Sequence, residues 1–252
     1  MATIAVSGKG GSGKTTIAAL IIRIIAERTG KAVLGVDADP NACLGLTLGV
    51  EPGRTIAELR DQAAQKTPDN PGADRVRTFE YGIQQAITEA KGFDLVTMGH
   101  PEGPGCYCAA NNILRTFLDK LGSQYEHIVM DNEAGMEHLS RRTTNKVDLL
   151  CIVAEPTAVG IITAKRILDL TKKLPIIVGS IGVIWNKTDA GSSIDGLNVL
   201  GTIPFDKAIS EAAISGKTIL DVDRNSPAIA AVEKILESQL CILNQDSRNQ
   251  SD

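Results

Sequence analysis

A glycine-rich stretch near the amino terminus, residues 8–16, constrains this chain more than any other feature. It follows an apolar run, Ala2 to Val6, that predicts a buried strand. It leads into Thr16 to Arg28, whose Ile and Ala spacing predicts a covered helix. Glycines allow a loop to turn its backbone N–H groups onto a phosphate, and the following helix adds the positive end of its dipole. Strand, loop and helix together predict a phosphate-binding P-loop.

Within this loop, Lys14 is predicted to reach the terminal phosphates and Thr15 to hold Mg²⁺, so we expect an ATP/ADP site that depends on Mg²⁺. The predicted nucleotide-binding residues of the loop are Gly8, Lys9, Gly10, Gly11, Ser12, Gly13, Lys14, Thr15 and Thr16.

Composition agrees with an enzyme of this kind. A chain of 252 residues that is 43% hydrophobic and rich in glycine can bury one substantial α/β core, so we expect one domain over residues 1–252. The net charge is −4, and no run of Lys or Arg marks a nucleic-acid or acidic-membrane surface. No stretch has the roughly 20 apolar residues of a membrane span, and no leader pattern opens the chain. We therefore expect a cytoplasmic protein without nucleic-acid or membrane partners.

Two further predicted strands end in carboxylates. Ala32 to Val36 precedes Asp37 and Asp39, and the strand from His127 to Met130 precedes Asp131. The carboxyl ends of parallel strands share one edge of a sheet, so these acids are predicted to face the phosphates. An apolar strand that ends in Asp is the Walker B arrangement, which places Asp131 near Mg²⁺.

Lys9 distinguishes this loop from an ordinary P-loop, because Lys14 already supplies the charge that the phosphates need. The loop resembles that of the family containing the nitrogenase iron protein and the septum-site, plasmid-partition and arsenite-pump ATPases. The resemblance implies a P-loop NTPase fold, with a mostly parallel twisted sheet flanked by helices on both faces. It also implies a homodimer in which Lys9 reaches the partner's nucleotide, as an arginine finger does. A solvated loop lysine is the alternative.

The same resemblance implies roles for residues elsewhere in the chain. Asp39 would orient the attacking water, and Asp37 would lie nearer the magnesium shell. Asn186, at the end of a predicted strand, would read adenine through its amide, and the turn at Pro204 would line the base pocket. Lys9, Lys14 and Asp39 are the predicted catalytic residues, and Thr15, Asp37 and Asp131 the predicted Mg²⁺ ligands.

A pair of cysteines, Cys106 and Cys108, stands at the start of a predicted helix from Ala110 to Leu121. A helix amino terminus lowers thiol pKa values and favours the thiolates that bind borderline metals. Two thiolates do not complete a tetrahedral Zn²⁺ or Ni²⁺ site, so the same pair from a second chain is the economical completion. A redox pair or two incidental thiols are the alternatives. The other cysteines, Cys43, Cys151 and Cys241, are predicted to be core thiols.

Residues 106–108 and 131–139, together with the loop and the 37–40 segment, narrow the resemblance to the CooC-type accessory ATPases of nickel insertion. In that family ATP turnover is tied to maturation of carbon monoxide dehydrogenase or acetyl-CoA synthase, so such a nickel enzyme is the implied client. A scaffold ATPase that handles no metal, or an iron–sulfur ATP-dependent reductase, remain as alternatives. An iron protein of the nitrogenase type would need a cysteine shortly after Asp131, and none is present.

Periodicity and punctuation predict the remaining elements. The predicted helices are Arg54 to Gln65, Tyr81 to Lys91, Thr157 to Leu174 and one that begins at Ser226-Pro227, and the predicted strands are Leu95 to Gly99, Asp148 to Ala154, Ile181 to Trp185 and Val199 to Ile203. The polar tail from Asn244 is predicted to fray.

Overall fold

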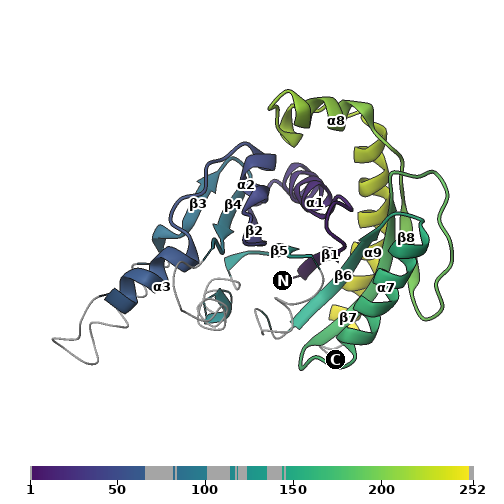
Figure 1. Cartoon of the computed structure of the whole chain (residues 1–252), viewed down its shortest axis with the longest axis horizontal. Helices are drawn as coiled ribbons and strands as arrows, with labels where there is room; N and C mark the ends of the chain where they lie inside the picture. The colour runs from purple at the N-terminus through teal and green to yellow at the C-terminus, as the bar shows by residue number, and fades with distance from the viewer. Residues whose placement is uncertain are drawn as a thin grey trace.

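A computed structural model describes residues 2–65, 82, 84–100, 114–116, 118, 124–134, 144 and 146–249 (Figure 1). The strands are β1 (Ala2–Gly8), β2 (Val33–Ala38), β3 (Ile87–Ala90), β4 (Phe93–Thr97), β5 (His127–Asn132), β6 (Lys146–Ala154), β7 (Ile177–Asn186) and β8 (Asn198–Ile203). The helices are α1 (Lys14–Thr29), α2 (Cys43–Leu48), α3 (Ile56–Gln65), α7 (Ala158–Thr171), α8 (Lys207–Ile214), the short 3₁₀ helix η2 (Ile219–Asp221) and α9 (Pro227–Asn249).

The eight strands form one sheet in the order β3-β4-β2-β5-β1-β6-β7-β8, and only β3 pairs antiparallel with its neighbour. β1 lies between β5 and β6, so the chain leaves the centre of the sheet toward both edges. In such sheets the ligand site lies outside the carboxyl ends of the central strands. The P-loop and the acidic strand ends meet at that edge.

Both faces of the sheet are covered, because alternate residues of the central strands point to opposite sides. One apolar cluster contains Val6 and Val153 together with α1 and α9, and the other contains Ala5 and Ile152 together with α3 and α7. Strands buried on both faces read as continuous apolar runs, which is why β1, β5 and β6 could be recognised from sequence. The predicted α/β P-loop fold is confirmed.

One predicted helix is wrong in its second half: residues 82, 84 and 85 are helical, but a strand follows them. The segment from Tyr81 to Lys91 contains β3, which pairs with β4 through the two-residue turn Lys91-Gly92. Gly92 has φ 88°, a conformation that a two-residue hairpin turn commonly requires. Pairing with β4 therefore overrides the helical composition of this segment.

The last helix also differs from expectation. α9 continues to Asn249, so the tail from Asn244 is helical, and its fraying stays a prediction. Pro227 is its first residue as predicted, but the helix cap comes from Asp206, whose carboxylate accepts hydrogen bonds from Ser226 Oγ (2.5 Å) and Ala228 N (3.2 Å). Among the described residues, no helix is long and apolar enough to cross a membrane.

Two of the isolated cysteines can be placed. Cys151 is buried in β6, as predicted, and burial raises the pKa of its thiol to about 12. Cys43 is exposed at the start of α2, so its assignment to the core is wrong. Partial burial and the neighbouring carboxylates, Asp37 first, raise the pKa of the Cys43 thiol. The side chain of Cys241 lies outside the described residues.

Candidate nucleotide site

The glycine loop connects the end of β1 to the start of α1, as predicted. Two of its glycines are required by close approach. A Cβ on Gly8 would lie 2.3 Å from the Val153 carbonyl oxygen of β6. Gly13 has φ 95°, and a Cβ there would lie 2.3 Å from Asn186 Nδ2 of β7. The loop is therefore held against two strands, and only glycine fits at these contacts.

The start of α1 is open to an anion. Gly13 is the N-cap residue, no side chain caps the helix, and its first turn contains no acidic residue. Unsatisfied N–H groups and the helix dipole at such an end favour phosphate. Lys14 is only 6% exposed, and its Nζ lies 3.4 Å from the Lys9 carbonyl oxygen. The ammonium group thus lies folded over the loop, where terminal phosphates are expected.

Two buried carboxylates face each other across neighbouring strands. Asp37 of β2 and Asp131 of β5 are register partners, and both are essentially inaccessible to solvent. Neither oxygen of Asp131 has a hydrogen-bond partner of good geometry. Burial raises the pKa of Asp131 to about 6, and the adjacent Thr15 hydroxyl and the Lys14 ammonium keep it from rising further. A buried carboxylate without a partner is costly, so this group is expected to have a ligand.

Asp37 and Asp39 are placed unequally. Asp37 accepts hydrogen bonds from Leu44 N (2.8 Å) and Asp39 N (3.2 Å), which fix the loop after β2. Burial raises the pKa of Asp37 to about 7, with Asp131 adding to the rise. Asp39 is partly exposed and accepts from the backbone N–H and the side-chain amide of Asn41.

A divalent cation fits this acidic cluster. Mg²⁺ typically uses one or two carboxylates and keeps several waters and phosphate oxygens, so it needs no protein cage. The orphaned Asp131 carboxylate and the Thr15 hydroxyl are donors of the required kind, with Asp37 beside them. Within the described residues, no three His, Cys, Asp or Glu side chains form a group suited to holding a metal ion alone.

On the side of the loop away from Asp131, Asn186 bonds to the protein itself. Its Nδ2 donates to the Ser12 carbonyl oxygen (2.8 Å), and its Oδ1 accepts from Lys187 N (3.0 Å). These bonds use one of the amide's two hydrogens and one of the two lone pairs on Oδ1. One donor and one acceptor position therefore remain for a base. Pro204 directly follows β8, and Ile203 of β8 pairs with Asn186. Adenine reading by Asn186 and Pro204 stays a prediction.

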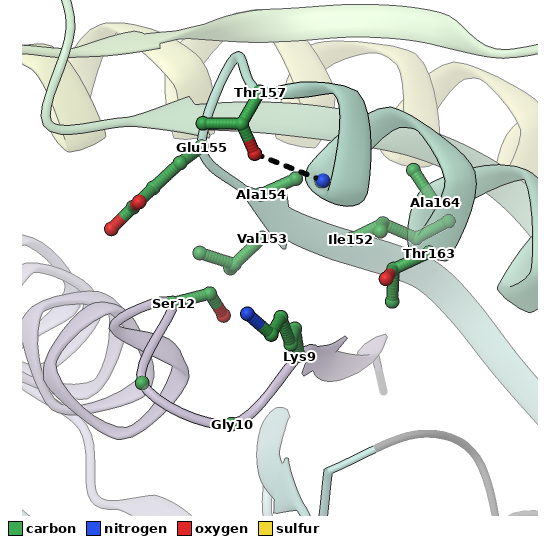
Figure 2. Close-up of a pocket in the computed structure, with 12 residues that line it drawn as sticks. Lys9, Gly10, Ser12, Ile152, Val153, Ala154, Glu155, Thr157, Thr163 and Ala164 are labelled. Atoms are coloured by element: carbon green, nitrogen blue, oxygen red, sulfur yellow. Dashed lines mark hydrogen bonds between the residues drawn. The ribbon is translucent and has the colours of Figure 1, made fainter.

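Lys9 is exposed and lines a pocket between the loop, the end of β6 and the start of α7 (Figure 2). The residues that line the pocket with it include Ser12, Glu155, Thr157 and Thr163. Figure 2 shows the Lys9 amino group turned toward the Ser12 side chain, inside the pocket. A role in a partner's site therefore requires this side chain to swing outward. Asn186 and Pro204, the predicted base-reading residues, do not line this pocket.

Three residues that the sequence patterns did not single out also support the loop. Lys187 Nζ pairs with Glu155 Oε1 (2.8 Å) and lies 3.5 Å from the Gly11 carbonyl oxygen. Asn132 donates from Nδ2 to the Val6 carbonyl oxygen (3.0 Å) and thereby ties β5 to β1. Lys187 and Asn132 each adjoin a residue at a predicted strand end. Their position in the sequence could therefore have indicated that they lie near the loop. Cys106 and Cys108 lie outside the described residues.

This combination of loop, helix terminus and acidic strand ends defines a P-loop nucleotide-binding protein. Residues 3–219 match the model of the CobQ/CobB/MinD/ParA nucleotide-binding domain family. The chain belongs to that family and is an ATPase of its type.

Individual relatives agree with this placement. The chain is 38% identical to the uncharacterized ATP-binding protein MJ0685 of Methanocaldococcus jannaschii, covering 93% of this chain and 96% of that protein. It is 34% identical to the carbon monoxide dehydrogenase accessory protein CooC of Rhodospirillum rubrum, covering 89% and 90%. The septum site-determining protein MinD of Pyrococcus horikoshii, solved with Mg-ADP, has a TM-score of 0.67 at 23% identity, covering 94% and 95%. That last likeness concerns the fold.

Proposed function

We propose that this protein is a Mg²⁺-dependent ATPase that binds Ni²⁺ or Zn²⁺ and assists nickel insertion into carbon monoxide dehydrogenase or acetyl-CoA synthase. Cys106 and Cys108 of two subunits would share the metal across a homodimer that nucleotide controls. The observation that carries the proposal is the 34% identity to CooC, which extends over nearly the whole of both chains. The cysteine pair supplies the thiolates that such a function needs.

The proposed hydrolysis uses residues of the described site. Lys14 and the open amino terminus of α1 bind the phosphates, and Thr15 and Asp131 would hold Mg²⁺, with Asp37 next to them. Bound Mg²⁺ neutralises charge on the phosphate oxygens. Asp39 is the partly exposed carboxylate of the cluster, so it is the one that can accept a hydrogen bond from an attacking water.

Dimerisation is proposed from Lys9. Lys9 is an exposed residue whose side chain lines the pocket beside β6 and can swing outward, whereas Lys14 is buried. When two sites face each other, an exposed lysine on the loop can neutralise charge on the partner's transferring phosphoryl group. The nucleotide then completes the interface, so ATP would favour the dimer and bring the cysteine pairs together.

A second candidate function is a nucleotide-switched scaffold that positions a partner without handling metal. The similarity in fold to MinD, a septum site-determining protein, favours this second function. The two candidates share the ATPase cycle and differ in the role of the cysteines. Metal binding therefore discriminates between them.

The test is an equilibrium titration with Ni²⁺ and with Zn²⁺, followed by size measurement, on the wild type and on a variant carrying Cys106→Ser and Cys108→Ser. The wild type should bind one metal per dimer and dimerise with it. The double variant should lose both properties and keep nucleotide binding. Cys43→Ser is the matched control, because Cys43 is an exposed thiol outside the pair.

If the double variant still binds one Ni²⁺ per dimer with unchanged affinity, the metal-carrier function is refuted. If the wild type binds no metal, the scaffold function takes its place. Iron together with sulfide in the purified protein would instead indicate a redox protein.

A further inference from the structure

The pocket beside the P-loop is separate from the predicted phosphate site. It lies between the loop, the end of β6 and the start of α7 (Figure 2). Lys14, Thr15 and Asp131, which are predicted to hold the phosphates and Mg²⁺, do not line it. Its volume is about 130 Å³, below the roughly 300–1,000 Å³ that is typical of sites for drug-sized ligands. The pocket therefore has room for a small ligand and not for a second nucleotide.

Ser12 contributes an unpartnered hydroxyl group to this pocket. The residue is only 5% exposed, and its Oγ is buried and has no hydrogen-bond partner. The backbone of Ser12 is fixed, because its N–H donates to the Lys9 carbonyl oxygen (3.2 Å) and its carbonyl oxygen accepts from Asn186 Nδ2 (2.8 Å). A buried hydroxyl group without a partner costs free energy, so this group is expected to have a ligand.

The groups around this hydroxyl favour a negatively charged ligand. The Lys9 amino group is turned toward Ser12 (Figure 2), and no described residue forms an ion pair with it. α7 begins at the pocket with Thr157 as its N-cap residue, and its first turn contains no acidic residue. Thr157 Oγ1 accepts from Gly160 N (3.1 Å), so the hydrogen of this hydroxyl group can still be donated to a ligand. An ammonium group, two hydroxyl groups and the positive end of a helix dipole therefore meet here.

The remaining lining of the pocket does not oppose an anion. Glu155 is its one carboxylate, and Glu155 Oε1 pairs with Lys187 Nζ (2.8 Å), which balances the charge. The strand side is formed by Ile152 and Val153, which are buried and apolar. Hydrogen bonds beside such apolar groups are stronger than in water. An oxyanion accepts several charge-assisted hydrogen bonds, so one oxyanion can satisfy the hydroxyl groups and the ammonium group together.

We propose that this pocket is a second anion site, in which Lys9, Ser12 and the start of α7 bind one small oxyanion, either inorganic phosphate or the carboxylate of a small acid. The inference goes beyond the proposed function, because the binding needs neither the cysteine pair nor a second subunit. A bound oxyanion would also hold Lys9 in the pocket, which Lys9 must leave to reach a partner's nucleotide. This effect on the dimer, unlike the binding itself, rests on the proposed function.

The test is equilibrium dialysis of the full chain against radiolabelled sulfate, with Mg-ADP at saturation so that ADP fills the P-loop. The wild type should bind one sulfate per chain with a Kd of about 1 mM or lower. Ser12→Ala should weaken sulfate binding about tenfold or more, the effect of losing a hydrogen bond to a charged group. Phosphate and acetate are the competitors, and the one that displaces sulfate at the lower concentration shows whether the natural ligand is a phosphate or a carboxylate.

Thr163 provides a matched pair of variants, because its side chain lines the pocket from α7 and lies outside the P-loop. Thr163→Glu places a negative charge beside the anion, and Thr163→Gln adds nearly the same volume without the charge. Sulfate should bind at least about tenfold more weakly to the Glu variant than to the Gln variant. Unchanged ADP affinity in both variants shows that they are folded.

Three results would overturn the proposal. The first is a wild type that binds no sulfate, which would leave the Ser12 hydroxyl group to water. The second is sulfate that neither phosphate nor acetate displaces. The third is equal sulfate binding by Thr163→Glu and Thr163→Gln, which would place the anion at the P-loop next to the phosphates of ADP and not in this pocket.

Discussion

At the scale of single residues, the two buried carboxylates determine how the stability of the ligand-free protein depends on pH. The pKa of Asp131 rises from its ordinary 3.8 to about 6, and that of Asp37 to about 7. Between pH 4 and pH 7 the folded chain therefore holds protons that the unfolded chain has released. Stability falls with pH wherever the folded state binds more protons, so these two groups make the ligand-free protein less stable as pH rises through that window.

Asp131→Asn tests this directly. The amide keeps the shape and removes the buried charge, so at pH 8 the ligand-free variant should gain on the order of 2 kcal/mol in unfolding free energy over the wild type. At pH 4 the difference should nearly vanish, and Mg²⁺-dependent ATP turnover should be lost. Urea denaturation at both pH values measures it. A variant that is less stable than the wild type at pH 8 would contradict the conclusion that the buried, ionised Asp131 destabilises the ligand-free protein.

Lys14 and Asp39 should separate binding from chemistry. Lys14→Gln keeps length but loses the charge that faces the phosphates, so we expect ATP binding and turnover both to be lost. Asp39→Asn should retain ATP and slow hydrolysis, because only the orientation of water changes. Nucleotide titration and single-turnover assays distinguish the two variants. Equal loss of binding in both would exclude this division of roles.

At the scale of elements, β6 and β7 hold the loop. Two of its glycines distinguish the effect of a steric clash from the cost of a left-handed backbone conformation. In Gly11→Ala the new Cβ lies in open space. The variant therefore loses only the free energy needed to keep a non-glycine residue at the left-handed φ of 78°, about 1–2 kcal/mol. Gly13→Ala adds a clash at 2.3 Å with the Asn186 amide, which bonds to Ser12. We expect Gly13→Ala to be the less stable variant and to bind nucleotide at least tenfold more weakly than Gly11→Ala. Thermal melts and ADP titration compare them, and equal effects would argue against the Asn186 contact.

The elements also explain which predictions succeeded. β1, α1, β2 and β5 follow from local pattern, because strands buried on both faces and a glycine loop carry strong sequence signals. β3 could not be recognised from composition, since Ile87 to Ala90 becomes a strand only by pairing with β4. The Asn186 bond to Ser12 joins residues 174 positions apart, so only the folded sheet reveals it. Asp37, Asp39 and Asp131 were found together because parallel strands end at one edge.

At the scale of the whole molecule, we predict that the exposed Lys9 acts on the nucleotide of a partner subunit. Lys9→Ala should bind nucleotide yet lose the ATP-bound dimer, with turnover falling on the order of a thousandfold, as when an arginine finger is removed. Mixing Lys9→Ala with Lys14→Gln should restore part of the activity, because one subunit keeps an intact loop while its partner supplies Lys9. Turnover of the mixture and sizes by light scattering are the measurements. A monomeric, fully active Lys9→Ala protein would refute action in trans.

The central claim is that metal and nucleotide act on one dimer. If ATP closes the dimer that Cys106 and Cys108 bridge, each ligand must tighten the other by the same factor, since coupling between sites is reciprocal. The most direct measurement is the Ni²⁺ affinity with and without a non-hydrolysable ATP analogue, paired with the affinity for that analogue with and without Ni²⁺. We predict tightening of both by one common factor, about tenfold, and its disappearance in the double Ser variant. A Ni²⁺ affinity that the nucleotide leaves unchanged would contradict the account.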